Sequence, residues 1–312
     1  MRMEAIKQMV DVVIPTYHPD QKFIMLIHRL QKQSHPIHKI IIMNTEESVW
    51  KTAGMEEIEN LPEVELHHVP QEEFDHGATR DLGIRYSKAP IVICMTQDAM
   101  PKHDSLAAQL LEGLKLPGVA VAYGRQLPTS DCDALECYTR SFNYPAGDQV
   151  KTQADLPKLG IKTFFSSNVC AAYRKDIYLQ LGGFIHKTIF NEDMIFAAGA
   201  IDAGYGVAYC GKAEVVHAHH YTAMQQFRRN FDLAVSQADH PEVFARVSSE
   251  REGIRLVKQN MAYLCRVKKP YLIPKLVGVS ACKYVGYRMG KQYQKLPMWL
   301  VKGCTMNQNY WK

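Results

Sequence analysis

Short apolar runs alternate with stretches of helical spacing over the first 125 residues, and this alternation restricts the fold more than any other feature. The runs are VDVVIP (10–15), KIIIM (39–43), APIVICM (89–95) and GVAVAYG (118–124). Amphipathic stretches such as FIMLIHRLQKQ (23–33) and LAAQLLEGL (106–114) separate them. Strands that are apolar throughout are buried on both faces, which is typical of a parallel sheet covered by helices. The pattern predicts an α/β fold, a mostly parallel sheet flanked by helices.

The later chain changes character twice. Segment 125–160 is polar and contains Pro and Gly, and we expect it to be a variable connection over the site. Strand and helix patterns return between 164 and 217, and the remainder has helical spacing and is rich in Tyr, Lys and Arg. We therefore expect a sheet-containing domain over residues 1–235 and a helical C-terminal extension over 236–312.

Cysteine placement and hydropathy bear on the compartment. The eight cysteines are scattered without a CxxC pair, and several, such as Cys94, lie in apolar runs. We therefore expect reduced core thiols and not a disulfide framework. The sequence shows no signal-peptide cleavage pattern and no run of 18 apolar residues. These features predict a cytoplasmic chain whose contact with a membrane, if it makes one, is peripheral.

Polar residues follow the buried runs, where a parallel sheet binds its ligands. Pro15, Thr16 and Tyr17 end the first run, which either exposes backbone groups to a nucleotide or is a simple turn. Gln97 and Asp98 follow the run IVICM. Asp98 is well placed to hold a divalent ion against a diphosphate, since Mg²⁺ and Mn²⁺ favour carboxylate and phosphate oxygens. A helix N-cap is the alternative reading of Asp98.

Two further clusters lie in the second half. Glu192 and Asp193 precede the apolar run MIFAAGAI, where they either complement a helix dipole or supply a base for an acceptor hydroxyl. The string HAHH, which contains His219, precedes Arg228 and Arg229. We expect His219 to complete a metal shell and the arginines to neutralise a diphosphate. For at least one of the three histidines, an ordinary structural role is the alternative, and the spacing does not support a zinc site.

In this order, the clusters resemble the family 2 glycosyltransferases, which have a GT-A fold, and among them bacterial rhamnosyltransferases of cell-surface polysaccharide assembly. The resemblance covers residues 10 to about 235. The motifs that carry it are VVIPTY (12–17), FDHGATRDLG (74–83), TQDAMP (96–101), NED (191–193), VVHAHHY (215–221) and QQFRRNFD (225–232). Each motif is loose by itself, but their order and distances are specific for fold and reaction class.

The resemblance implies an inverting, metal-dependent sugar transfer catalysed by the domain over 1–235. Asp193, in the paired acidic motif with Glu192, would be the base. Asp98 would be the retained carboxylate of an Asp-X-Asp metal motif that binds Mg²⁺ or Mn²⁺. The residues that would line the nucleotide and its phosphates are Pro15, Thr16, Tyr17, His76, Gly77 and Arg80.

The sequence departs from the family pattern at three positions. Gln97 stands where the metal motif has its first Asp, which removes one carboxylate. Asn44 stands where the family often has an Asp that contacts the nucleoside. Arg229 follows Arg228 where Trp is usual, which argues against a processive polymerase.

The resemblance also implies the substrates. The donor would be dTDP-L-rhamnose and the acceptor a glycan on a polyprenyl diphosphate. The basic and aromatic segment 266–303 suits an anionic membrane surface or a contact in a homo-oligomer, and a helical hairpin packed on the catalytic domain is the alternative. An inactive nucleotide-sugar-binding scaffold and an enzyme that uses a UDP-sugar are the competing functions. Nucleic acid is not an expected partner, because no recognised module occurs and the net charge is only +5.

Overall fold

One mixed β-sheet takes up the apolar runs of the sequence. The structure, a computed structural model, describes residues 9–218, 221–247 and 249–312. In these residues the sheet has nine strands, in the order β3-β2-β1-β4-β8-β6-β9-β5 with β7 paired to β9. The strands are β1 (Val10–Thr16), β2 (Lys39–Thr45), β3 (Val64–Val69), β4 (Ile91–Met95), β5 (Met100–Pro101), β6 (Val119–Leu127), β7 (Gln149–Lys151), β8 (Cys170–Arg174) and β9 (Gly206–Val216).

Strand direction brings distant segments together at one edge. Strands β3, β2, β1 and β4 are parallel, and β6 is parallel to β9. Strand β8 is antiparallel to both of its neighbours, β4 and β6. Met95 at the end of β4 therefore pairs with Cys170 at the start of β8. The residues that follow β4 lie beside those that precede β8, and the candidate site is built there.

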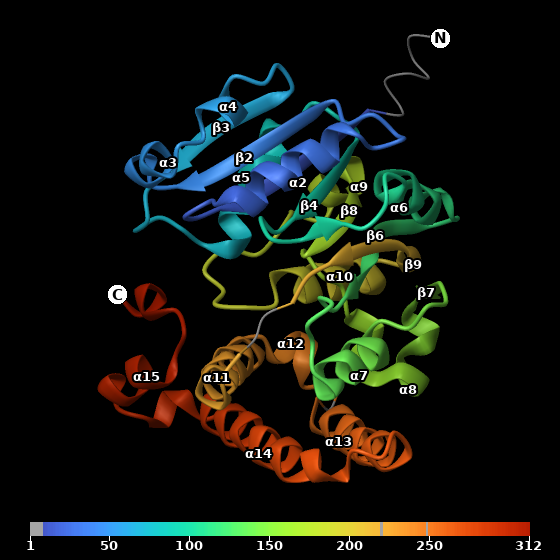
Figure 1. Ribbon diagram of the computed structural model, residues 1–312, viewed down its shortest axis with the longest axis vertical. Coiled ribbons are helices and arrows are strands. Elements are labelled where there is room, and N and C mark those ends of the chain that lie inside the picture. The colour runs from blue at the N-terminus through green and yellow to red at the C-terminus, as the bar shows by residue number, and fades with distance from the viewer. Residues whose placement is uncertain (1–8, 219–220, 248) are drawn as a thin grey trace.

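Helices cover both faces of the sheet, as the alternation of the sequence predicts (Figure 1). Side chains of β1 point alternately to two apolar cores. Val12 and Ile14 pack in a core with α2 and α6, and Val13 packs in a second core with α9 and α10. The α-helices are α2 (Gln21–Gln31), α3 (Glu47–Ala53), α4 (Glu56–Glu59), α5 (His76–Tyr86), α6 (Leu106–Lys115), α7 (Ala134–Asn143), α8 (Leu156–Leu159), α9 (Lys175–Gln180), α10 (Glu192–Asp202), α11 (Ala223–Asp239), α12 (Pro241–Phe244), α13 (Ser249–Arg266), α14 (Ile273–Gly290) and α15 (Met298–Cys304). Short 3₁₀ turns lie at Gln153–Asp155, Gly160–Phe164, Pro270–Leu272, Tyr293–Lys295 and Gln308–Trp311.

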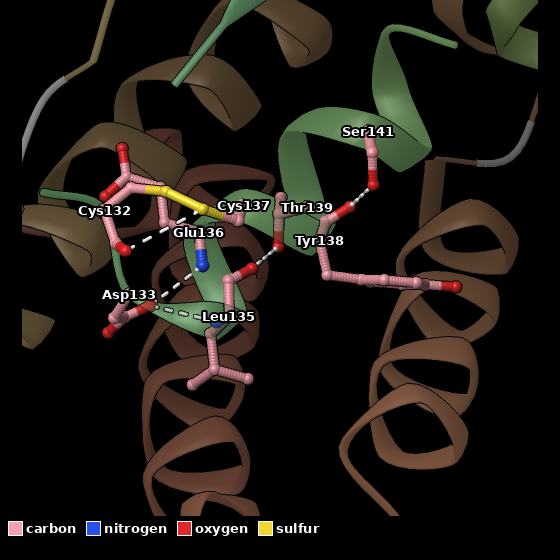
Figure 2. Close-up of a disulfide and its surroundings, with 8 residues drawn as sticks. All are labelled: Cys132, Asp133, Leu135, Glu136, Cys137, Tyr138, Thr139 and Ser141. Carbon is pink, nitrogen blue, oxygen red and sulfur yellow. Dashed lines mark hydrogen bonds between the residues drawn. A yellow bond between two sulfur atoms is a disulfide. The ribbon is translucent and has the colours of Figure 1, made fainter. Parts of the chain in front are cut away.

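Segment 125–160 is more regular than expected. Strand β6 continues to Leu127, and helices α7 and α8 and strand β7 follow. Asp133 caps α7, since its side chain accepts hydrogen bonds from the backbone N–H groups of Leu135 and Glu136 (Figure 2). A capped helix supplies the backbone partners that an irregular connection would lack. Segment 125–160 is therefore a connection with helices and a strand of its own, and its variability stays a prediction.

The cysteines also differ in part from the expectation. Cys132 and Cys137 form a disulfide across the start of α7, with their Cα atoms 6.0 Å apart (Figure 2). The expectation of reduced core thiols is wrong for these two, because the turn into the helix brings residues five apart within bridging distance. The buried free thiols are those of Cys94, Cys170, Cys210 and Cys304.

The C-terminal helices lie together at the end of the molecule away from β1–β4 (Figure 1). Helix α14 packs on α11, and glycines at the contact let the two backbones approach closely. A Cβ atom on Gly286 would overlap the backbone of Phe227, and one on Gly290 would overlap that of Phe231. Helix α11 runs through residue 235, so the division into domains over 1–235 and 236–312 stays a prediction. Among the described residues, no helix is both long enough and apolar enough to cross a membrane.

The contact between α11 and α14 can be tested with two glycines of the same helix. We expect Gly286→Ala to lower the free energy of unfolding by about 1–3 kcal/mol, because the added methyl group overpacks the contact. Gly278 faces open space, so Gly278→Ala should raise that free energy by about 0.5–1 kcal/mol through helix propensity. Urea unfolding of both variants measures the difference. Equal stability of the two would show that α14 does not pack this closely on α11.

Candidate active site

Gln97 joins the ends of β1 and β4. Its side-chain oxygen accepts a hydrogen bond from the Tyr17 backbone N–H at 2.8 Å, and its amide nitrogen donates to the Tyr17 carbonyl at 3.0 Å. The Gln97 side chain thus satisfies both backbone hydrogen-bonding groups of Tyr17, the residue that follows β1, as a neighbouring strand would do. This is a positioning role, and the expected contact of Gln97 with nucleotide stays a prediction. The positioning role also explains how an amide is useful where the family has a carboxylate, since a carboxylate cannot donate the second bond.

Asn44 joins the ends of β1, β2 and β3. It is fully buried and accepts a hydrogen bond from the Thr16 hydroxyl at 3.2 Å. Its amide nitrogen lies 2.8 Å from the Glu46 carbonyl and 3.0 Å from Nδ1 of His68. The buried side chains of Asn44 and Thr16 therefore hold the ends of these strands together, whereas the side chain of Tyr17 is exposed.

Asp98 lies beside a histidine of the HAHH string. Nε2 of His217 is 3.4 Å from Oδ2 of Asp98, and its Nδ1 is 3.3 Å from Oε1 of Gln126. Arg140 also donates to Oε1 of Gln126, which identifies that atom as the oxygen. Nε2 of His217 therefore faces the Asp98 carboxylate, and a cation between the two would be held by both groups.

His217, at the start of the HAHH string, is thus the histidine that the structure places next to Asp98. His219, the expected metal ligand, lies outside the described residues. The two donors, a carboxylate oxygen and an oriented imidazole nitrogen, suit Mn²⁺ or Mg²⁺ if phosphate oxygens and water complete the shell. Among the described residues, no group of three or more His, Cys, Asp or Glu is arranged to hold a metal alone.

Glu192 and Asp193 begin α10, and Asn168 holds both of them. The Asn168 backbone N–H donates to Oδ2 of Asp193 at 2.9 Å, and its side-chain amide donates to Oε1 of Glu192 at 3.1 Å. The Tyr173 hydroxyl fixes Asn168 by donating to its Oδ1 at 2.7 Å. Asn168 therefore sets the relative position of the two carboxylates.

Arg80 forms a buried ion pair with Glu192, with a nitrogen–oxygen distance of 3.2 Å. The guanidinium also donates to the His76 carbonyl at 3.1 Å. Burial disfavours the charged form of Glu192, but the charges of Arg80 and His76 and the hydrogen bond from Asn168 together outweigh it and hold the pKa of Glu192 below its usual value. Arg80 was expected to reach the phosphates, and its placement differs: it neutralises Glu192 inside the protein.

Asp193 has a different environment from its neighbour. It is partly exposed, and its two oxygens accept backbone hydrogen bonds from Asn168 and Met194. Burial, followed by the charge of Glu192, raises the pKa of Asp193 to about 7. Two adjacent carboxylates with pKa values driven apart by their surroundings are the usual sign of an acid–base assignment. Asp193 is the carboxylate that can take up a proton near neutral pH.

The start of α5 faces the loop before α10. Asp75 caps this helix by accepting from the Ala78 backbone N–H at 2.7 Å. Gly77 is required for packing, because a Cβ atom there would overlap the carbonyl of Ile185. Burial and the nearby charge of Arg80 lower the pKa of His76. Gly77 and His76 thus bring α5 against the acidic pair, and their expected contact with nucleotide stays a prediction.

The arginines of α11 lie on the other side of this region. Thr222 and Gln225 form a capping box at the start of the helix. The Arg229 guanidinium lies 4.6 Å from the ring centroid of Phe190, just before the acidic pair, and its charge contributes to the lowered pKa of His76. Arg229 therefore adds positive charge close to the pair, and the expected contact of Arg228 and Arg229 with a diphosphate stays a prediction. Arg228 is half-buried beside it.

The segment Ser167–Val169 links the two halves of the site. Ser167 accepts a hydrogen bond from Gln126, which orients His217, and Asn168 holds the acidic pair. The Thr96 backbone N–H donates to the Val169 carbonyl at 3.3 Å, next to Asp98. Sequence reasoning missed Asn168, Gln126 and His217. Polar residues directly before the buried strand β8 were the one available signal for Asn168.

Two relatives match almost the whole chain. The O-antigen chain rhamnosyltransferase RfbN of Salmonella typhimurium is 34% identical over 304 residues, which are 97% of this chain and 96% of the relative. The O-antigen chain rhamnosyltransferase WbaN of Salmonella anatum is 33% identical over 306 residues, which are 96% of this chain and 95% of the relative.

Solved structures share the fold at low sequence identity. A mannosyltransferase from Pyrobaculum calidifontis, solved in complex with GDP-Man and Mn²⁺, superposes with a TM-score of 0.56 at 16% identity, over 97% of this chain and 84% of that one. Residues 1–349 of S. aureus TarS superpose with a TM-score of 0.53 at 14% identity, over 92% and 91% of the two chains. These likenesses confirm the expected GT-A fold.

The motifs, the fold and the acidic pair thus agree with a direct match to a known family. The family profile described as glycosyl transferase family 2 covers residues 11–182. With this match and the two relatives, the resemblance noted in the sequence is confirmed. The chain is a glycosyltransferase and belongs to glycosyl transferase family 2.

Proposed function

We propose that this glycosyltransferase transfers L-rhamnose from dTDP-L-rhamnose to a saccharide acceptor, with inversion at the anomeric carbon, during polysaccharide assembly. The names of the two relatives support the sugar and the process. The observation that carries the reaction class is the environment of Asp193, a partly exposed carboxylate held by Asn168 beside a Glu192 that is ion-paired with Arg80.

The reaction is a single displacement. Asp193 takes the proton from an acceptor hydroxyl as that oxygen bonds to the anomeric carbon. The bond between the anomeric carbon and the phosphate oxygen breaks, and its electrons leave with the nucleoside diphosphate. Glu192 remains charged because Arg80 pairs with it, and its charge keeps the basicity of Asp193 high. Arg228 and Arg229 supply positive charge for the departing diphosphate.

We propose that Asp98 and His217 hold a divalent ion, Mn²⁺ or Mg²⁺. Their converging oxygen and nitrogen, 3.4 Å apart, support this assignment. When bound, the ion supplies Lewis-acid stabilisation of the leaving diphosphate. Gln97 positions the Tyr17 backbone, and the exposed Tyr17 ring with the neighbouring Pro15 forms the nucleoside surface.

The acceptor is proposed to be a glycan on a polyprenyl diphosphate, which places the enzyme at the inner face of the cell membrane as a peripheral protein. A UDP-sugar donor and an inactive nucleotide-sugar-binding scaffold are the competing functions. The missing first carboxylate of the metal motif favours the scaffold. The retained Asp193, with its raised pKa, favours the enzyme.

Thermal unfolding in the presence of nucleotide sugars tests the donor. We expect dTDP-L-rhamnose with Mn²⁺ to raise Tm more than UDP- or GDP-sugars do, because the donor that binds most tightly stabilises the folded protein most at a given concentration. A ligand at 100 times its Kd adds about 2.7 kcal/mol to stability. Omission of Mn²⁺ should reduce the shift, and dTDP alone serves as the control for the sugar. A response to UDP-sugars alone would exclude rhamnose. Donor binding without diphosphate release in the presence of acceptor would favour the scaffold.

A further inference from the structure

Helix α14 has two apolar sides, of which only one is covered. The glycine side, with Gly286 and Gly290, packs on α11. The opposite side is exposed, and its residues recur at spacings of three and four, so they form one stripe along the helix. This stripe, here called the α14 outer face, consists of Pro274, Val277, Gly278, Ala281, Tyr284 and Val285.

Exposed apolar side chains are also frequent in the C-terminal part of the chain. Among the described residues, ten of the eighteen large hydrophobic side chains that are exposed lie between residues 254 and 306. The most exposed are Trp299 in α15, at 74%, and Tyr271 just before α14, at 71%. A concentration of exposed apolar side chains in one part of a globular protein marks an interaction surface. Nothing in the sugar-transfer chemistry uses these side chains.

The same part of the chain is strongly basic. Residues 253–312 contain twelve Lys and Arg and no Asp or Glu, although the whole chain carries a net charge of only +5. Two acidic groups from other elements face the helix: Asp133, which caps α7, lies 2.6 Å from Lys275, and Glu250 of α13 lies 3.8 Å from Arg288. The exposed Lys268 precedes α14, and the exposed Lys291 and Lys295 follow the helix. These lysines add to the positive charge of this region.

This combination favours an anionic lipid surface over a second copy of the chain. A two-fold contact through the α14 outer face would place the same basic surfaces opposite each other and add like-charge repulsion. Anionic lipid headgroups attract Lys and Arg, at about 1 kcal/mol each near the surface, and accept apolar side chains below them. Trp and Tyr are suited to the boundary between headgroups and acyl chains.

We propose that the enzyme lies on an anionic phospholipid surface through the α14 outer face, with Tyr271, just before the helix, in the headgroup region. The proposal rests on the proposed function, in that a lipid-linked acceptor requires the enzyme to work at a membrane. It adds the surface that makes the contact and the lipid charge that the contact needs. Helix α14 lies along the surface and remains packed on α11.

Co-sedimentation of the full chain with vesicles tests the proposal. We expect binding to phosphatidylcholine vesicles that contain phosphatidylglycerol, little binding to pure phosphatidylcholine, and weaker binding at high salt. The triple variant Val277→Ser, Tyr284→Ser, Val285→Ser should lower the partition coefficient at least about tenfold, since it removes apolar side chains from the interface. The matched control, Met25→Ser, Leu116→Ser, Leu179→Ser, changes exposed apolar residues elsewhere and should bind like the wild type.

Each outcome supports or contradicts the proposal. Equal loss in both triple variants, or equal binding to neutral and anionic vesicles, would contradict it. So would a wild-type dimer in sedimentation velocity that the α14 variant breaks, because that result identifies a second copy as the partner. The vesicle measurement contains no nucleotide sugar, so its failure leaves the donor assignment untouched. The donor-dependent Tm shift of the α14 variant verifies that the variant is folded.

Discussion

Asp193→Asn is expected to lower turnover by about 10²–10⁴-fold, the usual contribution of a general base. An amide cannot take up the proton of the acceptor hydroxyl. The asparagine oxygen can still accept one of the two backbone hydrogen bonds that Asp193 accepts from Asn168 and Met194, so the local structure is largely kept. Donor affinity, measured by the Tm shift, should therefore change little. Initial rates of nucleoside diphosphate release, with acceptor present, measure the loss.

Two comparisons make this result specific. Asp176→Asn in α9 changes an exposed aspartate away from the site and should keep the wild-type rate. The pH dependence provides the second: the rate should rise with pH through about 7, because the carboxylate must lose its proton before it can act as a base. Glu192→Gln should move this rise to lower pH, since the charge of Glu192 contributes to the raised pKa of Asp193. A near wild-type rate for Asp193→Asn would refute the base assignment.

Asp98→Ala is expected to lower turnover about a hundredfold or more, since a metal ion at a leaving group contributes several kcal/mol to the transition state. The variant should also lose the part of the donor-dependent Tm shift that requires Mn²⁺, because the carboxylate that pairs with His217 is gone. Rates and Tm shifts are both measured over a Mn²⁺ titration.

A nearby aspartate serves as the control for this prediction. Asp104 is exposed a few residues further along the chain, and Asp104→Asn should preserve both readouts. His217→Ala should weaken the Mn²⁺ dependence in the same direction as Asp98→Ala. Unchanged Mn²⁺ dependence in Asp98→Ala would mean that the divalent ion binds elsewhere.

The parallel half of the fold could be predicted from the sequence because its signal is local. Segments such as VVIP (12–15) and IIIM (40–43) are apolar at every position, which is typical of a strand covered on both faces. The carboxyl ends of these strands then locate Tyr17 and Asp98 without further information. The direction of β8 has no such signal. A buried antiparallel strand has the same apolar sequence pattern as a buried parallel one. The placement of Asn168 beside the end of β4 was therefore not predictable from the sequence.

Pairings between distant residues explain the other differences. Arg80 and Glu192 are 112 residues apart, and no spacing rule joins them. The sequence offers an arginine near a nucleotide-binding motif, and only the packed structure reveals that a carboxylate already neutralises it. Gln97 is similar: its residue type suggests a weakened metal motif, whereas its two hydrogen bonds to Tyr17 give it a positioning role.

The insertion of β8 between β4 and β6 has a consequence for biosynthesis. A ribosome completes β4 and β6 before it makes β8, so the growing chain holds two strands whose common neighbour does not yet exist. Until residue 174 has emerged, the apolar strand β4 keeps an open edge, and such edges promote association between unfinished chains. Asn168 lies just before β8, but Glu192 and Asp193 emerge later, so the edge of β4 is closed before Asn168 can hold the acidic pair.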